Sequence, residues 1–571
     1  MKQLITICLL GIALVAEAQS SFDKFKQQQD SRFDKFKSDK QAEYDAFRQR
    51  ANAAYADFMR QAWESFPAHK PAEPIEEKTL PPVVYDAPKP EAVPQQPKTE
   101  PKPQVRPATE PIEELTEPVT EPLEELTEPV PEEVDIPEPL PPVKPLTTPK
   151  QAVKTTPAPQ PKQIPVQPKV VVVPKPAPAP EPIAPVRPKE DMPFQRVSIS
   201  YFGTIVTIGF PEADDLKLFQ TTSNNLKQPQ TISNNLSENA LADAWQQLAD
   251  AKYDITLKTA LDARKANNLC DWAYMKVLQA ATEKRYGKSN EAVLMQAFLM
   301  SQSGYRIRMG MNANRLYLLV ASDYNICGLT FFTLDGVKYY MVGEDKIPSM
   351  QICRAKFDKE KSLSLQLAQL PGLGDEPAPK RTLTSRKGVT ATVSVNKNLI
   401  DFFDSYPQAY LNNDFTTRWA AYANTPLDLS IQNTLYPPFR KVIASLSERD
   451  AVGLILNWVQ TAFQYAYDDE VWGGDRAFFP QETLFYPYSD CEDRAILFSR
   501  LVRDIVGLDV VLLYYPGHLA AAVAFTAQES GDWLQYGNRR YVVCDPTYIN
   551  APVGATMPGM DNQQAKVIVL K

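Results

Sequence analysis

The chain has 571 residues, a formal net charge of −8 and 10% aromatic residues. This length allows several domains, and the mildly acidic balance gives no indication of a nucleic-acid partner. The prolines are unevenly distributed, because 36 of the 52 lie between Pro67 and Pro193. That stretch is not expected to bury a core of its own.

The first 18 residues have the pattern of a secretory signal peptide. Lys2 precedes an apolar run, and Ala16-Glu17-Ala18 forms a small-residue cleavage site before Gln19. Cys8 lies in the apolar run without a lipobox, so no lipid anchor is expected. No later apolar run approaches the ~20 residues that a membrane-spanning helix needs. We therefore expect an exported protein, periplasmic or extracellular, without a transmembrane span.

Residues 19–66 predict a long helix, because aromatic residues recur every 11 positions without an intervening proline. Such a helix leaves a narrow apolar stripe exposed on one face. Self-association through residues 22–66 is the preferred interpretation, with docking on an envelope partner or a solvated single helix as alternatives. The series consists of Phe22/Phe25, Phe33/Phe36, Tyr44/Phe47 and Tyr55/Phe58, and Phe66 closes it.

Residues 67–193 predict a disordered tether rich in Pro, Glu and Lys, with the internal repeat TEPIEELTEPV and TEPLEELTEPV. This composition favours extended polyproline II segments. His69, at the start of the tether, is given no chemical role.

The remaining chain predicts a globular α+β fold in which one unit occurs twice. Residues 290–321 and 493–524 align without a gap, each as a helix, a glycine, a strand, a turn and a second strand. This indicates a degenerate first lobe at 194–346, beginning with a strand hairpin, a strand-rich connecting segment at 347–445 and a catalytic domain at 446–571. Chance similarity of two such units is the alternative.

Three residues of the last domain form the pattern of a nucleophile, a base and an orienting carboxylate. Cys491 follows Tyr488-Ser489-Asp490, His518 follows a Pro-Gly turn, and Asp545 ends a strand before a proline. A thiol, an imidazole and a carboxylate in these contexts are typical of nucleophilic acyl transfer. In the first lobe the equivalent positions hold Lys288, Arg315 and, approximately, Glu344.

Ser489 and Glu492 fit a capping box that places Cys491 in the first turn of a helix. The helix dipole and the free amide groups there would stabilise a thiolate and an oxyanion. Gln481 is the candidate side-chain donor to the oxyanion. Asp493 and Arg494 read as surface or helix-start charges without a catalytic role.

No cofactor and no metal are expected, since the sequence shows no zinc or calcium ligand spacing. The acidic run Asp468-Asp469-Glu470 could bind a cation but is better interpreted as a solvated loop. Cys491 aside, the mature chain keeps four cysteines, which are interpreted as buried apolar residues or disulfide partners: Cys270, Cys327, Cys353 and Cys544.

The order of SDCEDRA opening a helix, GH opening a strand and DPTY ending another resembles the transglutaminase-like superfamily over about residues 450–548. The resemblance implies a papain-like core with Cys491 as nucleophile, His518 as general base and acid, and Asp545 as the orienting carboxylate. Leu519-Ala520 replaces an aromatic residue often found after the histidine in that family, so substrate preference stays open.

The predicted activity is acyl transfer on a protein or peptide amide through a thioester. Water as acceptor would make the protein a protease or amidase, which is the preferred hypothesis, and an amine would make it a cross-linking transferase. A non-catalytic envelope scaffold is the third alternative.

Overall fold

The computed structural model describes residues 2–75, 78–85, 169–186, 193–212, 220–221, 230–232, 236–249, 253–343 and 347–571, with side chains from residue 24 onward. In these residues the fold is α+β, as predicted, with two six-stranded sheets and helices packed on them. No helix among them is long and apolar enough to cross a membrane.

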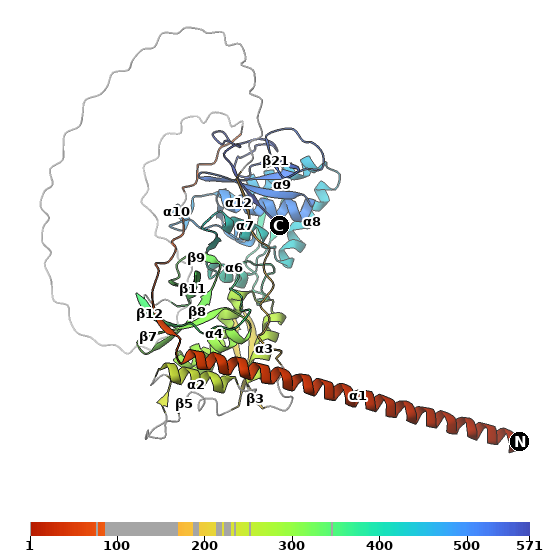
Figure 1. The fold of residues 1–571 in the computed structure, drawn as a ribbon. Coiled ribbons are helices and arrows are strands. Elements are labelled where there is room, and N and C mark those ends of the chain that lie inside the picture. Colours follow the sequence, from red (N-terminus) through yellow and green to blue (C-terminus); the bar gives the residue numbers. More distant parts are fainter. Residues whose placement is uncertain are drawn as a thin grey trace, which may run out of the picture. The chain divides into compact units, whose positions relative to one another are not determined.

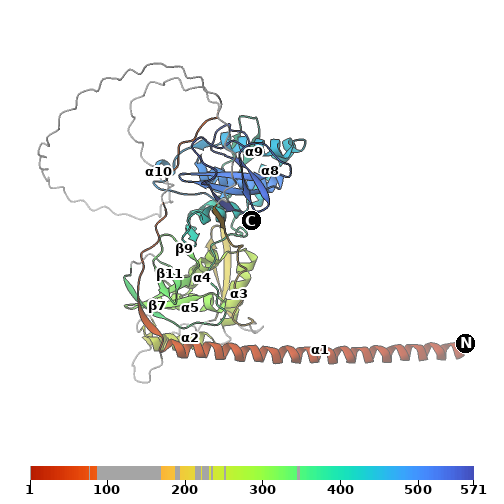
Figure 2. The ribbon, with the colours of Figure 1, turned by 45° about the horizontal axis from the view of Figure 1, so that its top comes forward.

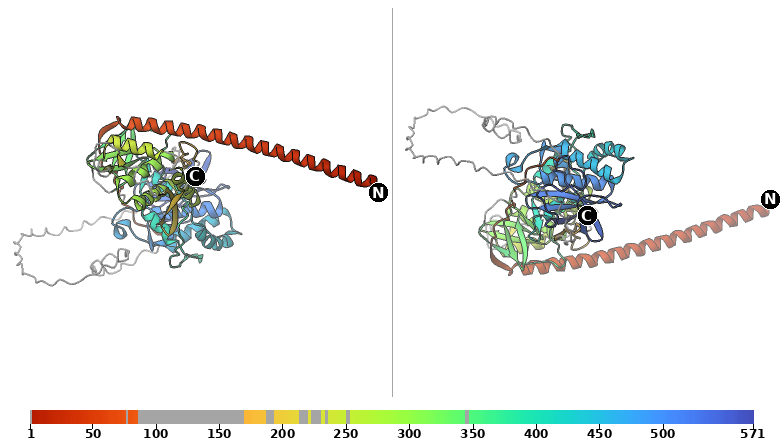
Figure 3. Two further views of the ribbon diagram at one scale, coloured as in Figure 1. Left: turned by 90° about the horizontal axis from the view of Figure 1, so that it is seen from below. Right: turned by 90° about the horizontal axis from the view of Figure 1, so that it is seen from above.

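Helix α1 runs from Lys2 to Met59, so it includes the expected signal segment. We expected the helix to end at Phe66, but it ends at Met59. The views in Figure 3 follow it without interruption to the N-terminus. Residues Trp63–Pro67 instead form strand β1, which pairs antiparallel with β12 (Ser349–Cys353). The aromatic period continues across this boundary, but strand pairing with a distant part of the chain takes precedence over it.

The C-terminal third of α1 packs on α2 (Glu238–Leu248; Figure 1). Tyr55 is 4% exposed and its ring stacks on Trp245 and on Phe357, with centroids 4.6 and 4.4 Å apart. Arg48 forms a buried ion pair with Asp254. This part of the predicted stripe is therefore covered by the same chain. Further towards the N-terminus the aromatic residues are exposed, among them Phe25, Phe33, Phe36 and Phe47.

The sheet of the first lobe has the strand order β1-β12-β7-β8-β11-β10. Its remaining strands are β7 (Ile307–Asn312), β8 (Arg315–Ala321), β10 (Phe331–Leu334) and β11 (Val337–Met341). Helices α4 (Asp271–Tyr286) and α5 (Asn290–Gln302) pack on each other, and α5 packs on β7 and β8. Since β12 belongs to this sheet, the lobe extends past the expected boundary at residue 346.

The sheet of the second lobe has the order β2-β22-β18-β19-β21-β20. Its strands are β2 (Lys169–Val172), β18 (Asp509–Tyr515), β19 (His518–Ala524), β20 (Trp533–Tyr536), β21 (Arg539–Cys544) and β22 (Lys566–Val569). Helix α12 (Cys491–Leu501) packs on β19 and β18 and continues as a π-helical turn, η3 (Val502–Val506). Gly507 then ends the helix with φ 81°, a left-handed conformation that suits glycine.

The two sheets have the same connectivity when β7, β8, β10, β11 and β12 are matched with β18, β19, β20, β21 and β22. The register matches too: Ile307 pairs with Val320, and Val510 pairs with Val523. An early chain segment forms the edge of each sheet, but β1 runs antiparallel to its neighbour and β2 runs parallel.

The prediction of a disordered tether over residues 67–193 is wrong at both ends of that range. The backbone N–H of His69 donates to the carbonyl of Phe331, and its ring stacks on that of Phe331. Near the other end β2 joins the second sheet, and the N–H of Ile183 donates to Gln302. A proline-rich composition does not prevent such pairing where the prolines leave individual N–H groups free. Residues 87–164 of the predicted tether lie outside the described part of the chain.

In the connecting segment 347–445 helices account for more residues than strands, so the segment is not strand-rich as expected. Of the two predicted strand stretches, residues 362–370 form no strand, whereas β14 (Thr390–Val393) pairs with β13 (Arg381–Thr384). The helices are α6 (Lys397–Asp404), α7 (Thr417–Asn424) and α8 (Leu429–Ile443). Apolar residues at helical spacing, such as Ile431, Leu435 and Phe439, bury one face of α8.

The remaining elements complete the two lobes. The expected hairpin is confirmed as β3 (Phe194–Tyr201) and β4 (Thr204–Pro211). In the second lobe α9 packs on α8 (Figure 2), and α7, α9 and α11 pack on α12. The other bounds are β5 (Gln220–Thr221), β6 (Gln230–Thr231), α3 (Asp254–Ala266), β9 (Tyr324–Ile326), β15 (Ala409–Leu411), α9 (Glu448–Ala462), β16 (Gln464–Tyr465), α10 (Asp468–Val471), α11 (Pro480–Phe485) and β17 (Tyr488–Ser489).

Candidate active site

The three predicted site residues all stand at element ends of the second lobe. Cys491 is the first residue of α12, His518 is the first residue of β19, and Asp545 directly follows β21. Strands β19 and β21 are paired, and α12 packs across β19. The fold thus brings to one place three residues that are separated by 27 positions in each interval.

His518 and Asp545 form a buried pair. The Nε2 atom of His518 lies 2.8 Å from Oδ2 of Asp545, and the two residues are 2% and 1% exposed. The other carboxylate oxygen accepts hydrogen bonds from the backbone N–H groups of Thr547 and Tyr548, at 2.9 and 3.0 Å. The carboxylate is therefore fixed from both sides. Among the described residues no hydrogen-bond partner reaches Nδ1 of His518, which leaves that nitrogen available for proton transfer.

The thiol of Cys491 is buried next to the histidine strand. The backbone N–H of Leu519, the residue after His518, hydrogen-bonds the sulfur, and the S–H donates to Oε2 of Glu492 at 3.1 Å. Burial raises the pKa of the Cys491 thiol well above its usual value, and the charges of Glu492 and Asp490 add to this effect. The thiolate stabilised by the helix start therefore stays a prediction, and in this state burial and then the neighbouring carboxylates disfavour the charged form of the thiol.

The helix cap lies one residue later than we expected. Asp490, not Ser489, is the N-cap of α12, and the carboxylate of Asp493 accepts the N–H of Asp490 at 3.2 Å. Ser489 accepts a hydrogen bond from Nε of Arg494, also at 3.2 Å. The local rule identified the helix start but not which of several neighbouring polar residues caps it.

Asp493 and Arg494 are fully buried, which corrects their interpretation as surface charges. The second oxygen of Asp493 accepts the N–H of Phe478 at 2.9 Å. The Arg494 guanidinium donates to the carbonyls of Gln460 and Phe463, at 3.3 and 3.0 Å. These bonds hold the start of α12 against the end of α9 and the loop before α11. Both residues support the position of Cys491 without touching the reacting atoms.

Gln460 on α9 was missed from sequence and supports the aspartate loop. Its Nε2 donates to the carbonyls of Asp545, Tyr548 and Ala551, at 3.0, 2.8 and 3.1 Å. A buried glutamine inside an apolar helical run was the only available signal. Gln481, the predicted oxyanion donor, is fully buried and uses Nε2 to bond the carbonyl of Pro426 at 2.8 Å. Its role at an oxyanion stays a prediction.

Tyr465 is a second candidate donor that sequence reasoning missed. Burial and the nearby charges of Cys491 and Asp490 raise the pKa of its phenol. The Arg494 guanidinium lies over its ring, 5.3 Å from the centroid. A neutral phenol near the sulfur has the chemistry needed to stabilise an oxyanion.

Carboxylates gather beside Cys491, where we expected a solvated loop. Asp468, Asp475 and Glu492 have oxygens within 4.8 Å of one another, as have Asp468, Asp490 and Asp493. Asp468 is only 8% exposed. Asp490 is fully buried, and burial together with the charge of Glu492 raises the pKa of its carboxyl well above the usual value. The acidic residues of the stretch SDCED could be seen in the sequence, but their contact with Asp468 and Asp475 depends on the tertiary structure.

The electrostatics of this acidic cluster follow from its burial. Burial and the charge of Glu492 together raise the pKa of Asp468 to about 8 and that of Asp475 to about 7. Arg418 forms a buried ion pair with Asp475 and opposes the shift. A cavity of about 250 Å³ opens on the cluster, lined by Asp468, Asp469, Asp475 and Asp490. Such an array of carboxylate oxygens is the kind of ligand set that Ca²⁺ prefers.

The first lobe holds different groups at the equivalent positions. Its helix α5 begins at Asn290, whose Oδ1 accepts the N–H of Leu316 at 2.9 Å, as the sulfur of Cys491 accepts that of Leu519. Asn290, not the exposed Lys288, therefore matches Cys491. The gap-free alignment fails there because Cys491 lies 16 residues before Gly507, whereas Asn290 lies 14 before Gly304. A π-helical turn such as η3 accommodates additional residues.

The other two positions of the first lobe also lack the catalytic groups. Arg315 opens β8 as His518 opens β19, in agreement with the sequence alignment. Val320 pairs with Tyr340 in the first lobe as Val523 pairs with Val542 in the second. By this register Gly343 is the position of the first lobe that is equivalent to Asp545. Glu344, the predicted equivalent, lies outside the described residues.

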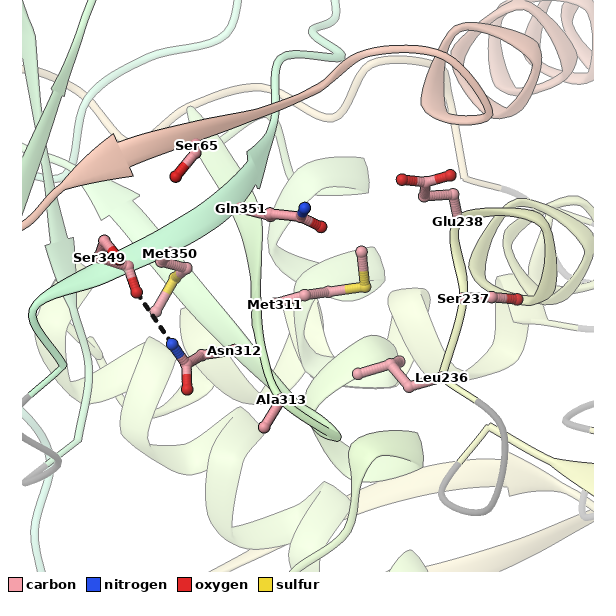
Figure 4. Close-up of a pocket in the computed structure, with 10 residues that line it drawn as sticks. All are labelled: Ser65, Leu236, Ser237, Glu238, Met311, Asn312, Ala313, Ser349, Met350 and Gln351. Carbon is pink, nitrogen blue, oxygen red and sulfur yellow. Dashed lines mark hydrogen bonds between the residues drawn. The ribbon is translucent and has the colours of Figure 1, made fainter.

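A larger cavity of about 530 Å³ lies in the first lobe at the end of β7, where its lining residue Asn312 pairs with Arg315 (Figure 4). It lies between β12, the end of β7 and the start of α2, and Asn312 donates across it to the carbonyl of Ser349 at 2.9 Å. Its lining contains a single carboxylate, Glu238, and no nucleophilic cysteine. The chemistry of the described residues is concentrated in the second lobe.

The five cysteines whose side chains the structure describes are free thiols, so no disulfide among them constrains the site. No protein-family model, curated protein or solved structure matches the chain.

Proposed function

We propose that this protein is an exported thiol enzyme that transfers acyl groups from a protein or peptide amide, with Cys491 as nucleophile. The observation that carries the proposal is the His518–Asp545 pair, whose imidazole keeps Nδ1 without a partner next to the start of the helix that bears Cys491. A thiol, an imidazole and an orienting carboxylate in this order form the minimal set for acyl transfer.

The chemistry follows from these groups. Nδ1 of His518 accepts the thiol proton while the sulfur of Cys491 attacks the amide carbonyl, and Asp545 stabilises the imidazolium that forms. The C–N bond then breaks, the imidazolium gives its proton to the leaving amine, and a thioester remains on Cys491. Water, activated by His518, cleaves the thioester and releases a carboxylic acid and the free thiol. An amine in place of water would give a new amide, which is the alternative outcome.

The two lobes are best explained as a duplicated core of papain-like, transglutaminase-like type. The identical strand order and the matched register of β7–β8 and β18–β19 support this proposal. The first lobe would then be a degenerate copy, since Asn290, Arg315 and Gly343 stand where Cys491, His518 and Asp545 stand. A non-catalytic scaffold is less favoured, because all three groups are kept in the second lobe.

The test is to trap the acyl-enzyme. The full chain is incubated with a p-nitrophenyl ester of a short peptide, and the mass added to the peptide that contains Cys491 is measured. We expect a thioester on Cys491, loss of the adduct in Cys491→Ala, and a strongly slowed reaction in His518→Ala. The variant Cys544→Ala is the matched control, because Cys544 is an equally buried cysteine of the same lobe. An unchanged adduct in Cys491→Ala would contradict the proposal.

We further propose that the N-terminal helix pairs with a second copy of the chain. The exposed residues Phe25, Phe36, Phe47 and Phe58 are spaced 11 apart and are each at least half exposed. Burying such a stripe is favourable at about 25 cal/mol per Å² of apolar surface. Light scattering on the full chain tests this proposal, since a monomer that is unaffected by Phe36→Asp would contradict it.

A further inference from the structure

An extended segment of the chain itself, residues 78–85 with the sequence KTLPPVVY, lies along the candidate active site. We call it the strap. It reaches the neighbours of all three site residues: Gly517 before His518, the residues after Asp545, and the cavity lined by Asp490, which precedes Cys491. Among the described residues of the expected tether, the strap is the segment that covers these groups.

The first half of the strap is held at the histidine turn. The N–H of Leu80 donates to the carbonyl of Gly517 at 2.9 Å. A β-carbon at Gly517 would lie only 2.9 Å from the carbonyl oxygen of Lys78, and the φ of Gly517 is +77°. Both the conformation and the close approach require glycine there. The Pro-Gly turn before His518 thus forms one wall of a site for an extended backbone.

The same half of the strap also contacts the nucleophile side. The side chain of Thr79 hydrogen-bonds the phenol of Tyr465, and that phenol donates to the carbonyl of Leu80 at 3.4 Å. Lys78 and Thr79 line the acidic cavity together with Asp490. A lysine ammonium next to this excess of carboxylates is electrostatically favourable. The strap therefore contributes a lysine to the lining of the cavity that the carboxylates line.

The second half of the strap is held at the loop after Asp545. The N–H of Ile549 donates to the carbonyl of Val83, and the N–H of Tyr85 donates to the carbonyl of Ile549, both at 2.8 Å. The side chain of Val83 packs with Tyr548 and Met557, and the ring of Tyr85 meets the edge of Tyr548. Main-chain hydrogen bonds to an extended segment, here with Val83 partly buried, are how proteins bind extended peptides.

We propose that the strap occupies the peptide-binding groove of the enzyme and blocks it, so that the groove recognises an extended peptide with an apolar residue before a Pro-Pro pair and a lysine towards its N-terminal end. This inference rests on the proposed acyl-transfer function. Pro81-Pro82 pre-organises the extended conformation, so the ordering cost of binding is small. Substrate enters when the strap leaves, which a competing peptide would achieve.

The test uses the full chain and the double variant Leu80→Pro/Val83→Asp, which removes the Leu80 N–H and the partly buried Val83 side chain. Val84→Asp is the matched control, because Val84 adjoins Val83 but is 42% exposed. Two rates are measured on the peptide that contains Cys491: alkylation by iodoacetamide and acylation by the peptide p-nitrophenyl ester. We expect both to rise about tenfold or more in the double variant, equivalent to about 1.4 kcal/mol of lost strap contacts, and to stay unchanged in Val84→Asp.

A synthetic peptide with the sequence of residues 78–85 should slow both reactions of the double variant, whereas a scrambled peptide should not. Equal alkylation rates in the wild-type protein and the double variant, with normal folding by circular dichroism, would overturn the strap proposal. Faster alkylation of the double variant, with no acyl-enzyme formed in any variant, would instead support the strap proposal and contradict the proposed function.

Discussion

The thiol of Cys491 donates a hydrogen bond to Oε2 of the adjacent Glu492, 3.1 Å away. In this state the nucleophile is therefore neutral and faces a carboxylate, while the imidazole nitrogen of His518 that should take its proton has no partner. The site contains the groups for catalysis, but the raised pKa of the Cys491 thiol keeps the nucleophile protonated. Any change that removes negative charge from the cluster should therefore activate the thiol.

Glu492→Gln should make Cys491 more reactive towards iodoacetamide near neutral pH. Loss of one negative charge beside the sulfur lowers the thiol pKa, so the midpoint of the alkylation rate against pH should shift down by about one unit or more. The readout is the pH profile of Cys491 labelling by mass spectrometry. Glu470→Gln, an exposed carboxylate on α10, should leave the midpoint unchanged. A midpoint that rises in Glu492→Gln would show that the carboxylate assists ionisation instead.

Asp545→Asn should lower the rate of acyl-enzyme formation by about two to four orders of magnitude. The amide cannot stabilise an imidazolium, and its NH₂ group opposes the orientation set by the 2.8 Å contact. Burst kinetics with the p-nitrophenyl ester measure the acylation step directly. Asp532→Asn, at an exposed position of the same lobe, is the control. Near-wild-type acylation in Asp545→Asn would remove Asp545 from the mechanism.

Ca²⁺ should bind the acidic cluster and stabilise the fold. Binding to the native state raises the free energy of unfolding, by about 2.7 kcal/mol when the ion is at one hundred times its Kd. The Tm should therefore rise with added Ca²⁺ and fall with a chelator, and Asp468→Asn should abolish both effects. Asp561→Asn, an exposed carboxylate, should retain them. The same ion should shift the alkylation profile of Cys491 to lower pH. Identical Tm values with and without Ca²⁺ would exclude this site.

Without divalent cations, the contribution of Asp468 to stability should decrease from about pH 4 to about pH 8. The pKa of Asp468 is about 8 in the folded protein, against about 4 in the unfolded chain. Between these values the folded state binds more protons, so the free energy of unfolding falls as the pH rises. Urea titrations along this range should give a shallower slope in Asp468→Asn than in the wild-type protein. Parallel slopes would mean that Asp468 keeps an ordinary pKa.

Tyr55→Ala should destabilise the first lobe by about 3 kcal/mol, the usual cost of removing a buried aromatic side chain. Tyr55 stacks between Trp245 and Phe357 and is 4% exposed. Phe36→Ala, at a residue that is 60% exposed on the same helix, should have little effect on a monomer. Denaturant titration followed by tryptophan fluorescence compares the two. Equal effects of both variants would indicate that the helix does not dock through Tyr55.

The amino-acid sequence alone identified what depends on local pattern. The position of Cys491 at a helix start, the strand opened by His518 after a Pro-Gly turn, and the strand ended by Asp545 all follow from short-range rules of capping and period-two alternation. The long N-terminal helix and the β3–β4 hairpin were predictable for the same reason. Each of these features is stabilised by contacts between residues that are close in the chain.

Only the tertiary structure decided which distant groups meet. Asp468 and Asp475 reach Glu492, Gln460 supports the loop after Asp545, and the strap crosses beside Gly517, because loop segments are placed by the elements that flank them and not by their own propensities. Burial then changed the chemistry: Asp468 and Asp493, which we interpreted as solvated or surface charges, lie in the interior, and burial together with the charges of Glu492 and Asp490 raises the pKa of Cys491. Local sequence carries no information on desolvation, which is a property of the packed fold.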